Sequence, residues 1–201
     1  MRPASLLLGL MLVALAIASP VAALDARMLT AHMVQHLLLM TLAPPLILFG
    51  APKFRWPALP LAVCWLAATA VLVGWHIPAL FRLAMQSAVW HGVEQASFLA
   101  AGLLFWRPVI QPAPQWPILL YLFFATLPCD ILSASLVFSD RVAYPMYLCV
   151  PPNSGASVLD DQQCAGALMW TCVTIVYLVA GTVVATRMLS LRNDPQSLEV
   201  V

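Results

Sequence analysis

Apolar residues occur along this chain in long runs that are almost free of charged side chains. A helix of about 20 apolar residues crosses the hydrocarbon core of a bilayer, and six runs approach that length. They cover residues 4–24, 29–50, 58–81, 88–106, 116–138 and 164–186. Backbone groups inside a bilayer must pair within their own segment. The pattern therefore predicts an all-α, polytopic transmembrane helix bundle of about six spans, forming one integral-membrane domain over residues 1–201.

The composition excludes two other classes of protein. Hydrophobic residues make up 63% of the chain and charged residues only 8%, whereas a soluble domain carries about 25% charged residues. Such a chain has too few charges to cover a water-facing surface. The net charge of +1, with Lys and Arg spread singly, also excludes a nucleic-acid binder, which needs clustered cations to neutralise phosphates.

Lys and Arg are unevenly distributed between the two sides of the predicted bundle. Six lie at the termini or in the connections of one side: Arg2, Lys53, Arg55, Arg107, Arg187 and Arg192. Three lie on the opposite side: Arg27, Arg82 and Arg141. Cytoplasmic segments carry the excess of positive residues. Both termini are therefore predicted in the cytoplasm, with the connections after the first, third and fifth runs outside.

Tryptophan and proline are expected to mark the ends of the runs. The tryptophans predicted for an interfacial belt are Trp56, Trp75, Trp90, Trp106 and Trp116. The prolines expected in connections and end turns include Pro44, Pro45 and Pro108. The first run has a second interpretation, because it follows Arg2 and ends in SPVAAL, as a cleavable signal peptide would. Cleavage would leave five spans and the same orientation for the rest.

All four histidines are predicted at the outer ends of the spans. His32 and His36 lie in the first turns of the second run, His76 near the end of the third and His91 near the start of the fourth. A spacing of four residues places His32 and His36 on one helix face. This gathering indicates a metal site, although interfacial histidines with purely structural roles are the alternative.

Sulfur ligands extend the same helix face and suggest which metal would bind. Met28 lies four residues before His32, and Met40 lies four residues after His36. Imidazole and thioether groups suit copper, and thioether particularly suits Cu(I). Copper is therefore the expected metal, while the alternative is that these methionines fill gaps in the core.

Two acidic residues within the runs need an explanation, because a charge at the bilayer centre is costly. Glu94 lies one turn after His91 on the same face and could accept a hydrogen bond from an imidazole N–H. Asp130 follows Pro128, which frees a backbone carbonyl and could open a polar pocket. Each is a possible auxiliary to the metal site, and structural pairing with another helix is the alternative.

The long connection before the last run contains acidic residues and a possible disulfide. Asp160 and Asp161 are expected to place negative charge at a helix N-terminus, where it is favourable. Cys149 and Cys164 bracket the connection and could form a disulfide if that side is oxidising. Their spacing is not that of a CxxC redox or metal pair.

Four segments, in order along the chain, resemble one known family. They are LTAHMVQHLLLMTLAPPLILFGAP, GWHIPALF, WHGVEQASFLAAGLLFWRPVI and LDDQQCAGALMW, within a similarity that extends over residues 17–187. The family is that of the caa(3)-type cytochrome c oxidase assembly factors, the CtaG-like multi-span membrane proteins. The resemblance implies a bacterial plasma (inner) membrane protein that helps a haem–copper oxidase mature, at the stage of copper insertion.

The resemblance also implies partners and ligands. The partners would be cytochrome c oxidase subunits, possible periplasmic copper chaperones and the lipid bilayer. The family's motif histidines correspond to His32, His36, His76 and His91 in this chain. One position departs from the family pattern, which has a second histidine directly after the glutamate of the fourth span. Here that residue is Gln95, so one possible ligand is missing.

Several functions are compatible with these residues. The first is an oxidase assembly factor that binds or hands over copper at the outer face of the membrane. The others are a copper uptake or resistance component, a metal-free oxidase scaffold, and a haem-binding electron carrier that uses His36 with His76 or His91. No enzyme is expected, because the chain contains no nucleophile elbow, phosphate-binding glycine loop or catalytic carboxylate pair.

Overall fold

The structure is a computed structural model that describes residues 2–19, 23–51, 59–110, 115–149 and 157–192. Regular structure in these ranges is helical, with no strand, which confirms the all-α prediction. The lengthwise elements are α1 (Pro3–Ala18), α3 (Leu29–His36), η1 (Leu37–Leu42), α4 (Ala43–Gly50), α5 (Leu61–His76), α7 (Ala88–Ile110), α8 (Gln115–Val137) and α9 (Val158–Arg192). Two short elements are α6 (Pro78–Gln86) and η2 (Pro145–Cys149).

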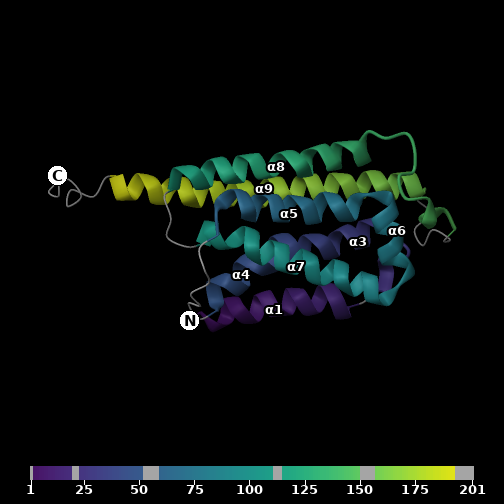
Figure 1. Cartoon of the computed structure of the whole chain (residues 1–201), viewed down its shortest axis with the longest axis horizontal. Coiled ribbons are helices and arrows are strands. Elements are labelled where there is room, and N and C mark those ends of the chain that lie inside the picture. Colours follow the sequence, from purple (N-terminus) through teal and green to yellow (C-terminus); the bar gives the residue numbers. More distant parts are fainter. Residues whose placement is uncertain (1, 20–22, 52–58, 111–114, 150–156, 193–201) are drawn as a thin grey trace.

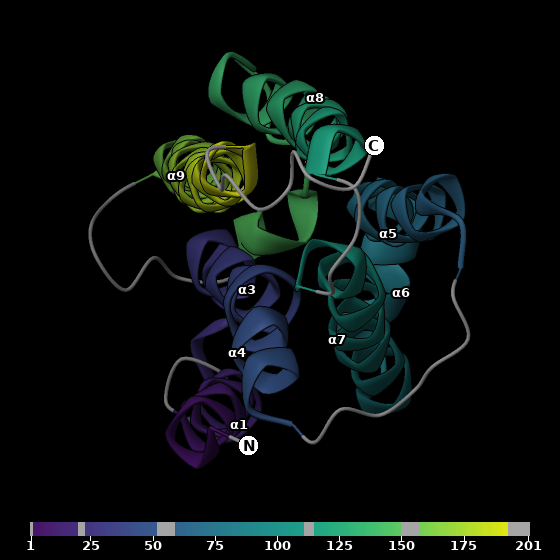
Figure 2. The same ribbon diagram turned by 90° about the vertical axis from the view of Figure 1, so that its left-hand side faces the viewer.

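The lengthwise helices form an elongated bundle with two distinct ends (Figure 1). Helix α1 begins and α9 finishes at one end, whereas α6 lies at the other, which we call the α6 end. The continuous run of α3, η1 and α4 lies centrally, next to α1, α7 and α9 (Figure 2). This central position explains why α3 buries polar side chains such as His32 and Gln35 as well as apolar ones.

Three helical segments among the described residues are long and apolar enough to cross a membrane. They are Leu29–Gly50, Trp116–Val137 and Val158–Ser190, and α5 with α6 would make a fourth if the bent pair is one span. Helix α1 is apolar but only 16 residues long, and α7 carries Glu94 and Arg107 among its 23 residues. Membrane spans are therefore supported, while the number six and the orientation remain predictions.

The central run changes helix type at its midpoint. Residues Leu37–Leu42 form a π-helix, and α4 begins immediately after it with Pro44 and Pro45 in its first turn. Pro44 has no N–H to donate to the carbonyl of Met40, four residues earlier. The indole Nε1 of Trp106 donates to that carbonyl instead, at 3.2 Å. The prolines thus lie within the span and not in a connection.

Trp106 was predicted in the interfacial aromatic belt, and for this residue the prediction is wrong. Its side chain is buried in the bundle, because the carbonyl that Pro44 leaves free needs a donor there. Trp90 and Trp116 are exposed, as a belt requires, while Trp75 is partly buried and donates to Ser97 Oγ at 2.8 Å. Trp56 lies outside the described residues.

Helix boundaries differ from the predicted runs at several places. The predicted third span, 58–81, is interrupted at Ile77, where α5 and α6 meet at a 75° bend. Ile77 has extended backbone angles, because the residue before a proline avoids the α region. Conversely, α7 passes beyond residue 106 to Ile110 with Pro108 inside it, and α1 stops at Ala18, before the predicted residue 24.

The last helix begins at Val158, six residues before the predicted start. Ser157 and Asp160 form a capping box, in which each side chain accepts a hydrogen bond from the other's backbone N–H. The predicted placement of Asp160 and Asp161 at a helix N-terminus is confirmed. Cys149 and Cys164 are exposed free thiols, so the possible disulfide is not formed.

Candidate metal centre

His32, His36 and Glu94 come together where α3 meets α7. The Nε2 atoms of both histidines lie 3.4 Å from the same carboxylate oxygen, Oε1 of Glu94. One ligand atom from each residue can be chosen so that all three lie within 4.8 Å of one another. Two ligand atoms that are both about 2 Å from one ion, at a tetrahedral angle, are about 3.3 Å apart. The two nitrogen–oxygen distances therefore suit a shared metal ion.

These three side chains are buried and lack good hydrogen bonds. His32 and Glu94 have no exposed surface and His36 only 5%. Within the described part of the chain, neither the ring nitrogens of the two histidines nor the Glu94 oxygens have a hydrogen-bond partner. Buried polar groups are normally paired, and a buried carboxylate needs a counter-charge. The cluster can obtain that counter-charge from a proton on an imidazole or from a metal cation.

His91 lies at the edge of the cluster, closer to the protein surface. Its ring centroid is 6.0 Å from that of His32, and its side chain is 20% exposed. His91 Nε2 lies 3.2 Å from an oxygen of Asp25, and it also contacts the amide of Gln95. Glu94 thus pairs with the α3 histidines and not with His91 of its own helix.

His76 lies on the other side of His36, at the C-terminal end of α5. The two ring centroids are 6.0 Å apart. His76 Nδ1 is 2.7 Å from the Leu72 carbonyl, while Nε2 has no partner among the described residues. The backbone carbonyl of His76 accepts a hydrogen bond from the Tyr144 hydroxyl at 3.0 Å. Burial raises the pKa of Tyr144, which keeps this phenol protonated as a donor.

The helix that carries the histidine pair is held at its beginning by α9. The carboxylate of Asp161 accepts hydrogen bonds from the backbone N–H groups of Leu29 at 2.6 Å and Thr30 at 3.3 Å. A carboxylate at a helix N-terminus satisfies N–H groups that have no partner within the helix. Gln35 Nε2 further ties α3 to α1 by donating to the Ala16 carbonyl at 3.1 Å. The direction and depth of the histidine pair are therefore fixed from two sides.

The auxiliary residues expected from the sequence have different positions. Met40 lines a small cavity together with His36 and His76. Met28 immediately precedes α3 and is partly buried, and Asp130 is partly buried on α8. The Met28 carbonyl accepts a hydrogen bond from the backbone N–H of His32 at 3.3 Å, but no described side-chain contact joins either residue to the histidine rings. Asp25 was not singled out from the sequence, where the only signal was an acidic residue just before the histidine-bearing run.

Comparison with known families gives an independent result. The family model of the cytochrome c oxidase caa3 assembly factors (Caa3_CtaG) matches residues 1–61 and 54–190, nearly the whole chain. The chain belongs to this family. The resemblance drawn from the four sequence segments is thereby confirmed. Searches of curated proteins and of solved structures found no match.

The Caa3_CtaG match also covers the whole candidate metal centre. The histidine pair of α3 lies in its first matched segment, and His76, His91 and Glu94 lie in its second. Membership supports a membrane protein with a role in oxidase assembly. The match by itself identifies no metal.

Proposed function

We propose that the protein helps to mature a haem–copper cytochrome c oxidase by binding copper at the outer face of the membrane and handing it over. The observation that carries the proposal is the buried cluster of His32, His36 and Glu94, whose ring nitrogens and carboxylate oxygens have no hydrogen-bond partner in the described structure. Oxidase subunits are the expected recipients, given the family to which the chain belongs. In this proposal the α6 end faces outward, and the membrane is the bacterial plasma membrane.

The charge of the cluster favours a cation of low charge. One carboxylate and two neutral imidazoles balance a single positive charge, as on Cu(I). Three ligands from two helices also leave a fourth coordination position open, in contrast to a structural site that is closed by four protein ligands. An incompletely coordinated ion is easier to transfer, which is what delivery requires.

His91 and Asp25 provide a route from the surface to the cluster. His91 is the most exposed of the four histidines, and its ring lies beside that of His32. Asp25 attracts cations and orients the His91 ring through the 3.2 Å contact. We infer that copper enters and leaves past this pair, so that His91 is a transfer ligand and His32 and His36 are holding ligands.

The geometry disfavours a haem-binding electron carrier. A pair such as His36 and His76 would need the macrocycle between the rings, but the cavity that both line has a volume of only about 30 Å³. Pockets for cofactors of that size measure roughly 300–1,000 Å³. A Soret absorption band in the purified protein would contradict this inference.

Metal analysis of the purified protein tests the proposal. Protein in detergent, loaded under reducing conditions and then desalted, is expected to retain about one copper ion at this cluster. Glu94→Gln and His36→Ala are expected to lose it, because each removes a ligand. Asp130→Asn is the matched control, since it neutralises a carboxylate of α8 that has no described contact with the histidines.

A cellular experiment links the site to oxidase assembly. In cells that carry Glu94→Gln, the oxidase is expected to accumulate with less copper and lower activity than in cells that carry Asp130→Asn. Normal copper content of the oxidase in the Glu94→Gln strain, together with no copper on the purified wild-type protein, would overturn the proposal. Association of the oxidase with a protein lacking all four histidines would then favour the metal-free scaffold.

A further inference from the structure

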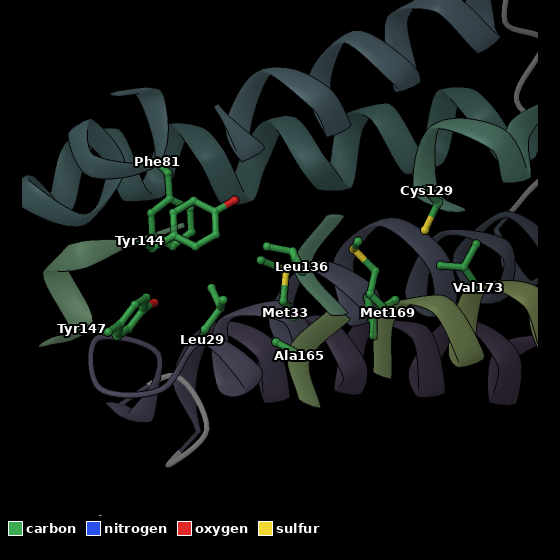
Figure 3. Packing of buried hydrophobic residues seen from close by; sticks show 11 residues of the cluster. Leu29, Met33, Phe81, Cys129, Leu136, Tyr144, Tyr147, Ala165, Met169 and Val173 are labelled. Carbon is green, nitrogen blue, oxygen red and sulfur yellow. The ribbon is translucent and has the colours of Figure 1, made fainter. Parts of the chain in front are cut away.

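A small cavity lies deeper in the bundle, next to the histidine cluster. Its volume is about 30 Å³, which is room for about two water molecules or one metal ion. The residues with sulfur that line it are Met33 and Met40 of the central run, Cys129 of α8 and Met169 of α9. Figure 3 shows Met33, Met169 and Cys129 on these facing helices, within one buried cluster.

One nitrogen ligand at this cavity has no partner. The ring of His76 lines the cavity and is only 6% exposed. Its Nδ1 faces the Leu72 carbonyl, so Nε2 is the free ring nitrogen, and it has no hydrogen-bond partner in the described structure. Packing of apolar side chains does not account for a buried imidazole nitrogen that is left unpaired.

We propose that this cavity is a second metal site, specific for a soft monovalent ion such as Cu(I), with the thioethers of Met33, Met40 and Met169 and Nε2 of His76 as its ligands. The proposal rests on the copper chemistry of the proposed function and adds a site that differs in ligand type. Thioethers bind Cu(I) and discriminate against hard cations and against Cu(II). The ion enters and leaves as Cu(I), so binding needs no oxidant or reductant.

The position of the cavity suggests what the second site does. His36 belongs to the first cluster and also lines the cavity, so an ion can pass between the sites with one ligand retained. The outer cluster contains nitrogen and oxygen ligands near the surface, whereas the inner site contains mainly sulfur. The inner site would hold Cu(I) out of reach of water and oxygen until the outer cluster has been emptied.

X-ray absorption of the full-length protein in detergent, loaded with Cu(I), tests the inner site. The wild type is expected to show sulfur neighbours around copper, and Met33→Leu/Met169→Leu, which leaves only the thioether of Met40, is expected to lose most of them. Competition with a chromogenic Cu(I) chelator should show a loss of affinity of about tenfold or more in the same variant. Leucine is close to methionine in volume and is tolerated in cores, so folding is expected to survive.

The matched control is Met11→Leu/Met188→Leu, which removes two thioethers outside the cavity and should keep both the sulfur signal and the affinity. Copper surrounded only by nitrogen and oxygen, and unaffected by Met33→Leu/Met169→Leu, would overturn the inner site. The outer cluster would then stand if Glu94→Gln abolished that binding. A copper content that is unchanged from the wild type in Glu94→Gln and His32→Ala, with all of the copper bound to sulfur, would support the inner site and refute the outer one.

Discussion

Replacing Gly102 by alanine is expected to destabilise the protein, because α7 crosses the central run at this residue with no space for a side chain. A Cβ atom at position 102 would lie 2.6 Å from the Met40 carbonyl oxygen and 2.6 Å from Cγ of Pro44. Both belong to rigid parts of the chain, a helix backbone and a proline ring. Neither can move aside as the end of a flexible side chain would.

The size of the effect follows from the displacement that relieves the clash. To restore an ordinary contact of 3.4 Å, α7 must move away from the central run by about 0.8 Å. A gap of that size forfeits a quarter to a half of the dispersion energy of each contact it opens. Overpacking of a core costs about 1–3 kcal/mol, and about 2 kcal/mol would lower the melting temperature of a chain of this length by about 4–8 °C.

Thermal denaturation in detergent, followed by tryptophan fluorescence, measures this shift. Gly92→Ala is the matched control, because it makes the same substitution on α7 where nothing lies within 4 Å of the new atom. Alanine favours helix over glycine by up to about 1 kcal/mol, so the control should be as stable as the wild type or more stable. Equal stability of the two variants would refute the close approach of α7 to the central run.

Three further predictions concern other parts of the structure. Trp106→Phe leaves the Met40 carbonyl without its donor and should cost about 1–3 kcal/mol in the same denaturation assay; wild-type stability would contradict this role of the indole. Asp161→Asn weakens the cap of α3 by about 0.5–2 kcal/mol and should speed hydrogen exchange in the first turn of that helix, whereas unchanged exchange would count against it. A membrane-impermeant maleimide added outside spheroplasts should label the exposed thiols of Cys149 and Cys164; labelling only after the membrane is opened would reverse the predicted orientation.

The positions of the helices were predictable because hydropathy is a local property. Each of the six apolar runs coincides with helical structure, since a run of that composition has few other ways to bury its backbone polar groups. Local patterns do not show where a helix bends or changes type. The prolines at 44 and 45 stay within a span because the indole of Trp106, a residue far along the chain, supplies the missing donor. The indole reaches the Met40 carbonyl only after α7 has packed against the central run.

The site was predictable only in its local part. The four-residue spacing correctly places His32 and His36 side by side, with ring centroids 4.2 Å apart. The partner of Glu94 depends on how α7 is rotated against α3, which the spacing to His91 does not determine. Asp25 comes from a short connection without periodicity, and its contact with His91 is set by tertiary packing alone.

The carboxylate that anchors the start of α3 is contributed by a residue 132 positions further along the chain. The histidine-bearing segment therefore emerges from the ribosome well before Asp161 has been made. Until then the first turn of α3 lacks the carboxylate that accepts from its backbone N–H groups, so the histidine pair has only the anchor that Gln35 makes to α1. The histidine pair of α3 therefore reaches its final geometry only after the last helix has packed against the start of α3.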